Sequence, residues 1–181
     1  MPRYVALLRG INVGGKNLNA MPKLKACFEA AGFDDVATYI QSGNVIFETT
    51  RGQGGLADDI ESALEATFDI PLLVVVRSHQ QLAKVVTAAP KGFGTEPETY
   101  RYDVMFLKEP LSAKTVVKDV PVKEGVDEVS AGSGVIYSSR LASRATQSRV
   151  SRFVSMPVYK SVTVRNWNTT TKLLSLLDAR R

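Results

Sequence analysis

Two polar turns carry most of the residues that could do chemistry in the first half of the chain. Residues 9–17 read Arg-Gly-Ile-Asn-Val-Gly-Gly-Lys-Asn and follow an apolar run at residues 4–8, and residues 41–44 read Gln-Ser-Gly-Asn. Glycine lets the backbone take positive φ and lets a ligand come close to its N–H groups, and a helix start just beyond such a loop favours anions. The candidate ligand-binding residues in these turns are Arg9, Gly10, Asn12, Gly14, Gly15, Lys16, Asn17, Gln41, Ser42 and Asn44.

A third polar stretch lies near the C-terminus, between an expected strand and an expected helix. It consists of Arg165, Asn166, Trp167 and Asn168, and it holds the single tryptophan of the chain. Trp167 could stack on a base or another ring. A lone tryptophan more often fills a core or a domain interface. We add these four residues to the candidate ligand-binding set, and the sequence leaves open whether they reach the first two turns.

Catalytic and metal sites have weaker support in the sequence. The glycine loop lacks the Gly-x-x-x-x-Gly-Lys-Ser/Thr pattern of a P-loop, and its glycine spacing does not match a dinucleotide-binding fingerprint. Glu48 and Asp103 are candidate general bases only by their positions in expected strands, and Ser42 has no histidine to activate it. The single Cys27 and the single His79 show no metal-ligand spacing. We therefore assign no catalytic residue and expect no metal and no cofactor.

Composition bounds the class of protein. The chain has 181 residues with 44% hydrophobic content, enough for one large domain or two small ones. No apolar run reaches membrane-spanning length, and residues 1–4 lack the zones of a signal peptide. One cysteine allows no internal disulfide, which suits the reducing cytoplasm. We therefore expect a cytoplasmic protein that does not bind a membrane.

The net charge of +5 hides an asymmetry along the chain. From Ser138 to the end, nine Lys and Arg residues stand against one acid, Asp178. A basic third of this kind could attract phosphate groups. Charge alone, however, favours the simpler interpretation of a solvated basic face.

Hydrophobic periodicity predicts two successive βαββαβ units. In the first half, strands at residues 4–8, 36–41, 45–48 and 72–76 alternate with helices that begin near Met21 and Leu56. Ser78 and Gln81 have the spacing of a capping box and open a further helix. In the second half, strands are expected at 102–107, 126–130, 135–138 and 161–164, with helices after Ser112 and around Phe153, and a last helix at about 169–179.

We therefore predict an α+β fold of two ferredoxin-like βαββαβ lobes in tandem with a C-terminal helix. The expected boundaries are an N-terminal lobe with its following helix at residues 1–89, a linker at 90–101, and a C-terminal lobe with the terminal helix at 102–181. In such a unit the loop after the first strand and the hairpin after the second strand lie at the same end. The two polar turns of the first lobe should therefore share one rim.

Three segments resemble the DUF1697 family. These are Ala-Leu-Leu-Arg-Gly-Ile-Asn-Val-Gly-Gly-Lys-Asn at 6–17, Thr-Tyr-Ile-Gln-Ser-Gly-Asn-Val-Ile-Phe at 38–47 and Thr-Val-Arg-Asn-Trp-Asn-Thr at 163–169. The resemblance covers nearly the whole chain. It implies a mainly bacterial protein of cytosolic type, with a two-lobed α+β fold of ferredoxin-like character and no assigned activity.

Three functions remain open. The first is a module that binds phosphate-bearing ligands or other anions, with nucleic acid as the leading ligand. The second is a small-molecule enzyme or sensor that holds an anionic group between the lobes with Arg9 and Lys16. The third is a structural protein, a monomer or a homodimer that pairs through an edge strand. We rank anion binding first.

Overall fold

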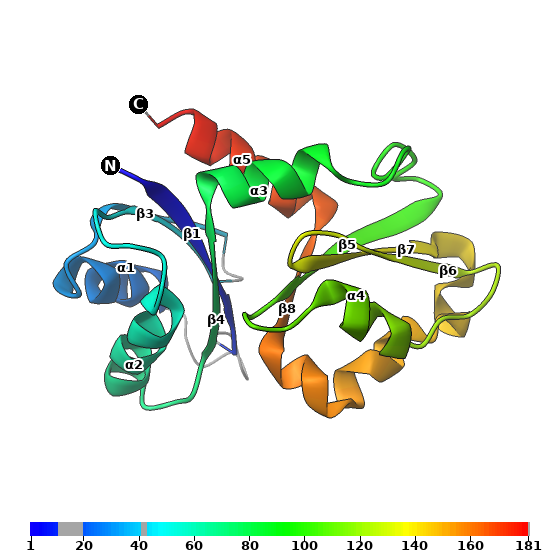
Figure 1. Ribbon diagram of the computed structural model, residues 1–181, viewed down its shortest axis with the longest axis horizontal. Coiled ribbons are helices and arrows are strands. Elements are labelled where there is room, and N and C mark those ends of the chain that lie inside the picture. The colour runs from blue at the N-terminus through cyan, green and yellow to red at the C-terminus, as the bar shows by residue number, and fades with distance from the viewer. Residues whose placement is uncertain (11–19, 41–42, 181) are drawn as a thin grey trace. The chain divides into compact units, whose positions relative to one another are not determined.

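The chain forms two compact units, each built around its own antiparallel sheet of four strands. The computed structural model describes residues 1–10, 20–40 and 43–180 (Figure 1). Unit 1 comprises Met1–Leu82 together with Leu173–Arg181, and unit 2 comprises Ala83–Lys172. The two sheets, with helices between their strands and a C-terminal helix, confirm the predicted α+β fold of two tandem lobes. The predicted boundaries at residues 89 and 101 stay a prediction.

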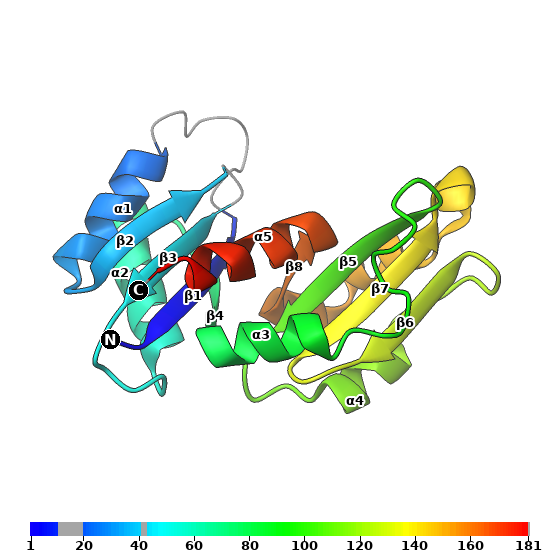
Figure 2. The ribbon, with the colours of Figure 1, turned by 90° about the horizontal axis from the view of Figure 1, so that it is seen from above.

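Unit 1 has full-length helices on one face of its sheet. Its elements are β1 (Arg3–Arg9), α1 (Ala20–Ala30), β2 (Asp34–Tyr39), β3 (Asn44–Glu48), α2 (Leu56–Phe68) and β4 (Leu73–Ser78), and the strand order is β2-β3-β1-β4. Both helices cover the same face (Figures 1 and 2). Helix α2 buries Leu56, Ile60 and Leu64, as its four-residue spacing predicts. Central strand β1 is therefore covered by a continuous apolar core.

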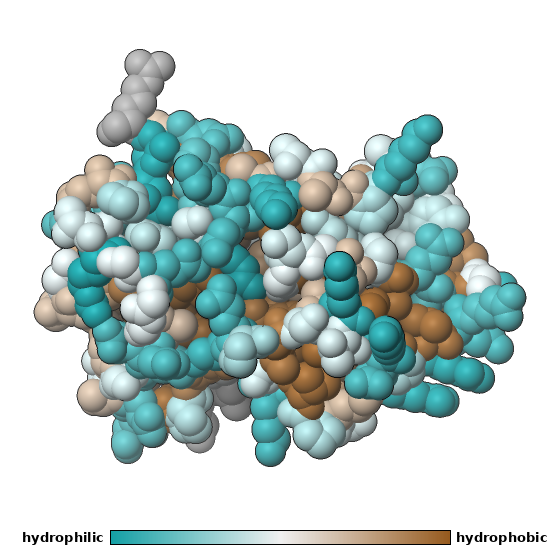
Figure 3. All heavy atoms as spheres, in the orientation of Figure 1, coloured by the Kyte–Doolittle hydropathy of each residue, from teal (hydrophilic) through white to brown (hydrophobic). Residues whose placement is uncertain are grey.

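Unit 2 keeps the same topology with much shorter helical segments. Its strands are β5 (Tyr100–Leu107), β6 (Asp127–Ala131), β7 (Val135–Leu141) and β8 (Val162–Asn166), in the order β6-β7-β5-β8. Between the strands lie α4 (Ala113–Val116) and the 3₁₀ segments η2 (Val117–Asp119), η3 (Ala142–Gln147), η4 (Val150–Ser155) and η5 (Pro157–Ser161). On the face drawn in Figure 3, hydrophobic residues come to the surface in several places over this unit.

The helix expected around Phe153 is instead a series of 3₁₀ turns. Val150, Phe153, Met156 and Tyr159 all pack on the core of unit 2, and they recur every third residue. Val154 is 58% exposed. A 3₁₀ helix repeats every three residues, so this spacing buries one row of side chains without an α-helix. Serines lower the helix propensity of the segment, and Pro157 removes a donor that an α-helix would need.

The last strand of each sheet, β4 (Leu73–Ser78) or β8, carries a buried arginine and leads into a capped helix. Arg77 in β4 and Arg165 in β8 are both buried, and in each the Nη1 donates to the carbonyl of the preceding residue. The next residue caps a helix. Ser78 Oγ accepts from the Gln81 N–H at 3.2 Å at the start of α3 (His79–Thr87), which confirms the predicted capping box.

The cap of the last helix is Asn166. Helix α5 spans Trp167–Asp178, and Asn166 Oδ1 accepts from the Thr169 N–H at 2.8 Å. The helix thus begins two residues before the start at about residue 169 that the sequence predicted. Asn166 takes the role because its short side chain reaches the third helical N–H.

The second half of α5 belongs to unit 1. Arg3 Nη1 donates to the carbonyl of Leu177 at 2.6 Å, and His79 Nε2 lies 2.6 Å from Asp178 Oδ1. Arg180 pairs with Asp35. These contacts fix the last residues of the chain against the first strand. No helix among the described residues is both long and apolar enough to cross a membrane.

Candidate anion-binding site

The described parts of the two polar turns lie side by side in unit 1. Leu8 N–H donates to the Gly43 carbonyl at 2.9 Å, and Leu7 pairs with Asn44 across β1 and β3. Arg9, half-buried, ends β1 at this edge. The other candidates in these turns, Asn12, Gly14, Gly15, Lys16, Asn17, Gln41 and Ser42, lie outside the described residues.

Local structure already explains three of the residues at this edge. Asn44 is fully buried, and its Nδ2 donates to the Tyr39 carbonyl at 2.9 Å, which closes the hairpin. Gly43 has φ +82°, a conformation that favours glycine. Gly10 has φ +103°, and a Cβ there would lie 3.2 Å from Leu72 Cδ2. These three residue types are required by the fold itself.

In unit 2 the unequal lengths of two neighbouring strands create a notch. Strand β8 ends where Asn166 pairs with Asp103, but β5 continues to Tyr100 and pairs there only with β7. Helix α5 begins at this point. The notch has a volume of about 290 Å³. It is lined by Gly94, Pro97, Tyr100, Arg101, Tyr102, Asp103, Arg140, Asn166, Trp167 and Asn168.

The charges in the notch are two arginines and one aspartate. The Arg140 Nε is buried and has no hydrogen-bond partner among the described residues. Arg101 is exposed and lies directly opposite Arg140 in the register of β5 and β7. Burial raises the pKa of Asp103, and the nearby Arg140 cation partly opposes that shift. Arg140 as a whole is half-buried and lines the notch, so the two arginines give the notch cationic groups that suit an anionic ligand.

Trp167 forms an aromatic wall of the notch. Its ring meets Phe93 edge-on, with centroids 5.0 Å apart and planes at 90°. Gly94 makes this contact possible, because a Cβ there would lie 2.2 Å from Trp167 Nε1. The segment expected as a linker therefore packs on unit 2 at this point. Asn166 and Asn168 stand exposed beside the tryptophan.

Arg165, the fourth candidate of the C-terminal stretch, does not line the notch. It is buried in β8, where Nη1 donates to Thr163 Oγ1 at 2.9 Å and to the Val164 carbonyl at 2.8 Å. Burial lowers the pKa of Arg165 to about 10. The side chain therefore remains a cation at neutral pH and serves the interior of the sheet.

Sequence reasoning missed the two arginines and two tyrosines of the notch. Tyr100 and Arg101 fell in the expected linker, and Arg140 fell beyond the expected end of its strand at Ser138. Polar residues alternate through 100–103 and continue the period of the apolar strand that follows. That alternation is the signal that the strand already begins before Tyr102. Among the described residues, no group of three or more His, Cys, Asp or Glu could hold a metal ion.

Comparisons with known proteins agree with the fold. Residues 1–137 match the model of DUF1697, a family described as proteins of unknown function. A solved structure, described as that of conserved bacterial protein SP0830 from Streptococcus pneumoniae, matches with a TM-score of 0.86 and 24% identity over 98% of this chain and 99% of that chain. This likeness shows the shared fold, and no curated protein matches the chain. Since the family model covers most of the sequence, the chain belongs to the DUF1697 family.

Proposed function

We propose that the protein binds a phosphate-bearing ligand, with the notch of unit 2 as a principal site. The observation that carries the proposal is that two arginines, Arg101 and Arg140, line the notch beside a single acid, Asp103, among the described residues. Guanidinium groups bind phosphate oxygens through charge-assisted hydrogen bonds. The basic stretch from Ser138 onward adds to the positive net charge of the chain, which favours anionic ligands in general.

The other lining residues favour a ligand with both a phosphate and a ring. Asn166 and Asn168 are exposed at the start of α5, where amide groups and the helix end favour an anion. Trp167, Tyr100 and Tyr102 offer aromatic faces next to the cations. Aromatic faces beside cations are the means by which proteins hold single-stranded nucleic acid, so a nucleotide is the preferred form of the ligand.

The glycine loop of the first lobe forms the second part of the proposal, on sequence grounds. Arg9 and Lys16 supply two cations, and Gly14 and Gly15 supply backbone N–H groups that a phosphate can approach. Arg9→Ala and Lys16→Ala should weaken binding of phosphate-bearing ligands, while Arg140→Gln weakens the notch alone. Separate effects of the two sets would indicate two sites.

Calorimetric titration with AMP, with adenosine as the matched ligand lacking phosphate, tests the notch. AMP should bind and adenosine should bind much more weakly. Arg140→Gln should weaken AMP binding about tenfold or more, since hydrogen bonds to charged groups contribute about 1.5–3 kcal/mol. Arg152→Gln, an exposed arginine away from the notch, should leave binding unchanged. Equal binding of AMP and adenosine, or no binding of either, would refute the proposal.

Nucleic acid is a separate arm of the same test. A short single-stranded oligonucleotide should bind with an affinity that falls as salt rises, because phosphate contacts release counterions. Arg140→Gln should reduce the slope of log affinity against log salt by roughly one contact. If AMP binds and the oligonucleotide does not, the ligand is a free nucleotide or a smaller phosphate ester.

One observation favours an enzyme as a second candidate function. Asp103 faces the same notch as Arg140, and burial raises the pKa of its carboxyl. A carboxyl with a raised pKa beside a cation can take or give a proton during hydrolysis of a bound ester. In a panel of phosphate esters, Asp103→Asn should abolish turnover while it preserves or tightens AMP binding. Turnover that survives Asp103→Asn would exclude this role.

A further inference from the structure

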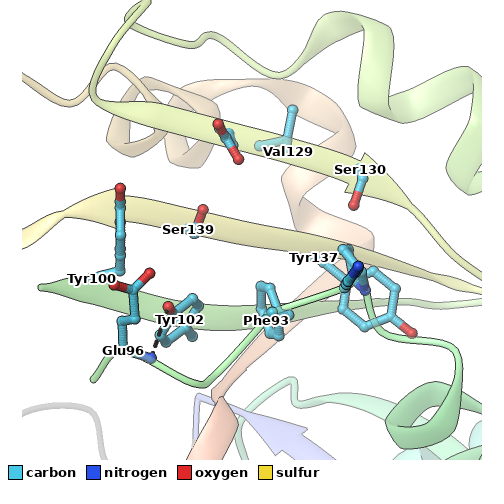
Figure 4. A pocket seen from close by; sticks show the side chains of 12 residues that line it. Phe93, Glu96, Tyr100, Tyr102, Val129, Ser130, Tyr137 and Ser139 are labelled. Atoms are coloured by element: carbon cyan, nitrogen blue, oxygen red, sulfur yellow. Dashed lines mark hydrogen bonds between the residues drawn. The ribbon is translucent and has the colours of Figure 1, made fainter.

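A second pocket lies on the other face of the unit 2 sheet, away from α4 and the 3₁₀ segments. The segment between α3 and β5 forms one wall of the pocket, and residues of β5, β7 and β6 form the rest (Figure 4). The pocket has a volume of about 320 Å³. That volume is at the lower end of the range for small-molecule sites. It is lined by Pro90, Lys91, Gly92, Phe93, Glu96, Tyr100, Tyr102, Glu128, Val129, Ser130, Tyr137 and Ser139.

Strand alternation explains why aromatic and acidic side chains share this face. Met105 and Leu107 of β5 belong to the core beneath α4, so Tyr100 and Tyr102 point to the opposite side. Register then places Tyr102 opposite Ser139 of β7, and Ser139 opposite Glu128 of β6. One row across three strands therefore holds a tyrosine, a serine and a glutamate.

The aromatic rings are held in place by one another and by hydrogen bonds. Phe93 lies edge-on to Tyr102 and Tyr137, with centroid separations of 4.9 Å and 5.4 Å. The Glu96 N–H donates to Tyr102 Oη at 3.2 Å, and Tyr137 Oη donates to the Val85 carbonyl at 2.5 Å. The Tyr100 ring lies 6.0 Å from that of Tyr102. The pocket wall is therefore formed before any ligand arrives.

Two carboxylates stand at the pocket beside these rings. Glu96 comes from the covering segment and Glu128 from β6, and both residues are exposed. Neither forms an ion pair with any residue in the described part of the chain. Among the described residues, Lys91 is the one cation that lines the pocket, so the two glutamates outnumber it. The charge is thus opposite to that of the notch.

We infer that this pocket binds a small organic cation, an ammonium group recognised by the faces of Tyr100, Tyr102 and Phe93 together with Glu96 and Glu128. Aromatic faces attract cations through the ring quadrupole, and the attraction grows when the cation loses water. Two nearby carboxylates add Coulomb attraction that a neutral ligand does not feel. This inference goes beyond the proposed function, because it concerns a different pocket and the opposite charge.

The test compares choline with 3,3-dimethyl-1-butanol, which has the same shape without the charge. Binding is followed by the tyrosine ring signals in NMR spectra of the full chain. Choline should bind saturably and shift the signals of Tyr100 and Tyr102. The neutral alcohol should bind at least tenfold more weakly, since a desolvated cation–π contact contributes about 2 kcal/mol.

Variants then assign the binding to the carboxylates. The double variant Glu96→Gln/Glu128→Gln should weaken choline binding roughly tenfold, by the loss of two charges close to the cation. Glu124→Gln, an exposed glutamate outside the pocket, is the matched control and should have no effect. Lys91→Gln removes the opposing cation and should tighten choline binding about twofold.

Three results would overturn the inference. They are equal binding of choline and the alcohol, no saturable choline binding, and unchanged affinity in the double glutamine variant. All three variants alter exposed residues, so thermal melts should match that of the wild type and exclude misfolding. Arg140→Gln should leave choline affinity unchanged. Failure here therefore leaves the AMP result standing, and failure of AMP binding leaves the choline result standing.

Discussion

Unit 1 and unit 2 share a strand order but cover their sheets by different means. Unit 1 uses α1 with 11 residues and α2 with 13 residues, whereas unit 2 uses α4 with four residues and a series of 3₁₀ turns. Both nevertheless bury a continuous apolar face of the sheet. The two units therefore share strand order and register, whereas the segments that cover their sheets differ.

The units also differ in what their sheets offer to a ligand. Unit 1 places its glycine-rich turn at the end of β1, and the described flanks of that turn are tightly packed. In unit 2 the unequal strands and the segment before β5 leave two pockets on either side of the same tyrosines. Unit 2 thus has both the shorter helices and the two pockets described above.

The largest effect should come from removing a core phenylalanine from the 3₁₀ turns. Phe153 is 1% exposed, as is Phe28 in α1 of unit 1. Phe153→Ala and Phe28→Ala should each lower the free energy of unfolding by about 4 kcal/mol. Val154→Ala, at an exposed position, is the control and should cost little. Denaturant melts measure all three, and a much smaller loss for Phe153→Ala would mean that the short turns pack more loosely than α1.

Two glycines with nearly the same backbone conformation give the next largest contrast. Gly94 in unit 2 has φ +82° with Trp167 in the way of a Cβ, whereas Gly55 in unit 1 has φ +81° with open space around it. Gly94→Ala should cost about 3 kcal/mol, from backbone strain plus overpacking. Gly55→Ala should cost about 1 kcal/mol, from strain alone. Equal losses in thermal melts would show that the Trp167 contact is easily displaced.

The two helix caps should have smaller and equal effects. Ser78→Ala at α3 and Asn166→Ala at α5 each remove a side-chain acceptor from a helical N–H. Each should cost about 1 kcal/mol in denaturant melts. Thr171→Ala, inside α5, is the control and should cost less. A negligible loss at Asn166 would show that the helix after β8 does not depend on a side-chain cap as the helix after β4 does.

The smallest effect is a pH dependence confined to unit 2. Because the pKa of Asp103 is raised on folding, its charged form is disfavoured in the folded chain. The resulting loss of folding stability is absent below the ordinary pKa of 3.8 and develops as pH rises toward the raised pKa of the folded chain. Asp103→Asn should therefore gain stability relative to wild type as pH rises through that range, and the gain should persist at higher pH. Melts in a pH series measure this gain, and parallel curves would contradict it.

The fold was predictable because the strands and the helices of unit 1 show the expected periodicity of hydrophobic residues in the sequence. The four-residue spacing from Leu56 and the capping box at Ser78 were both read correctly. The 3₁₀ turns around Phe153 were predicted wrongly as a helix. A three-residue hydrophobic period is rare, and over a short segment it resembles the pattern of an α-helix. The notch at Arg101 and Arg140 depends on where β8 stops relative to β5, and strand ends are set by tertiary packing rather than by local residue type.

The docking of Leu173–Arg181 in unit 1 has a consequence for synthesis of the protein. Arg3 binds the carbonyl of Leu177, so one contact of the first strand can form only after Leu177 has been translated. Unit 2 includes no residue beyond Lys172. Synthesis that stopped before Leu173 would thus give every residue of unit 2 but leave unit 1 without its last segment.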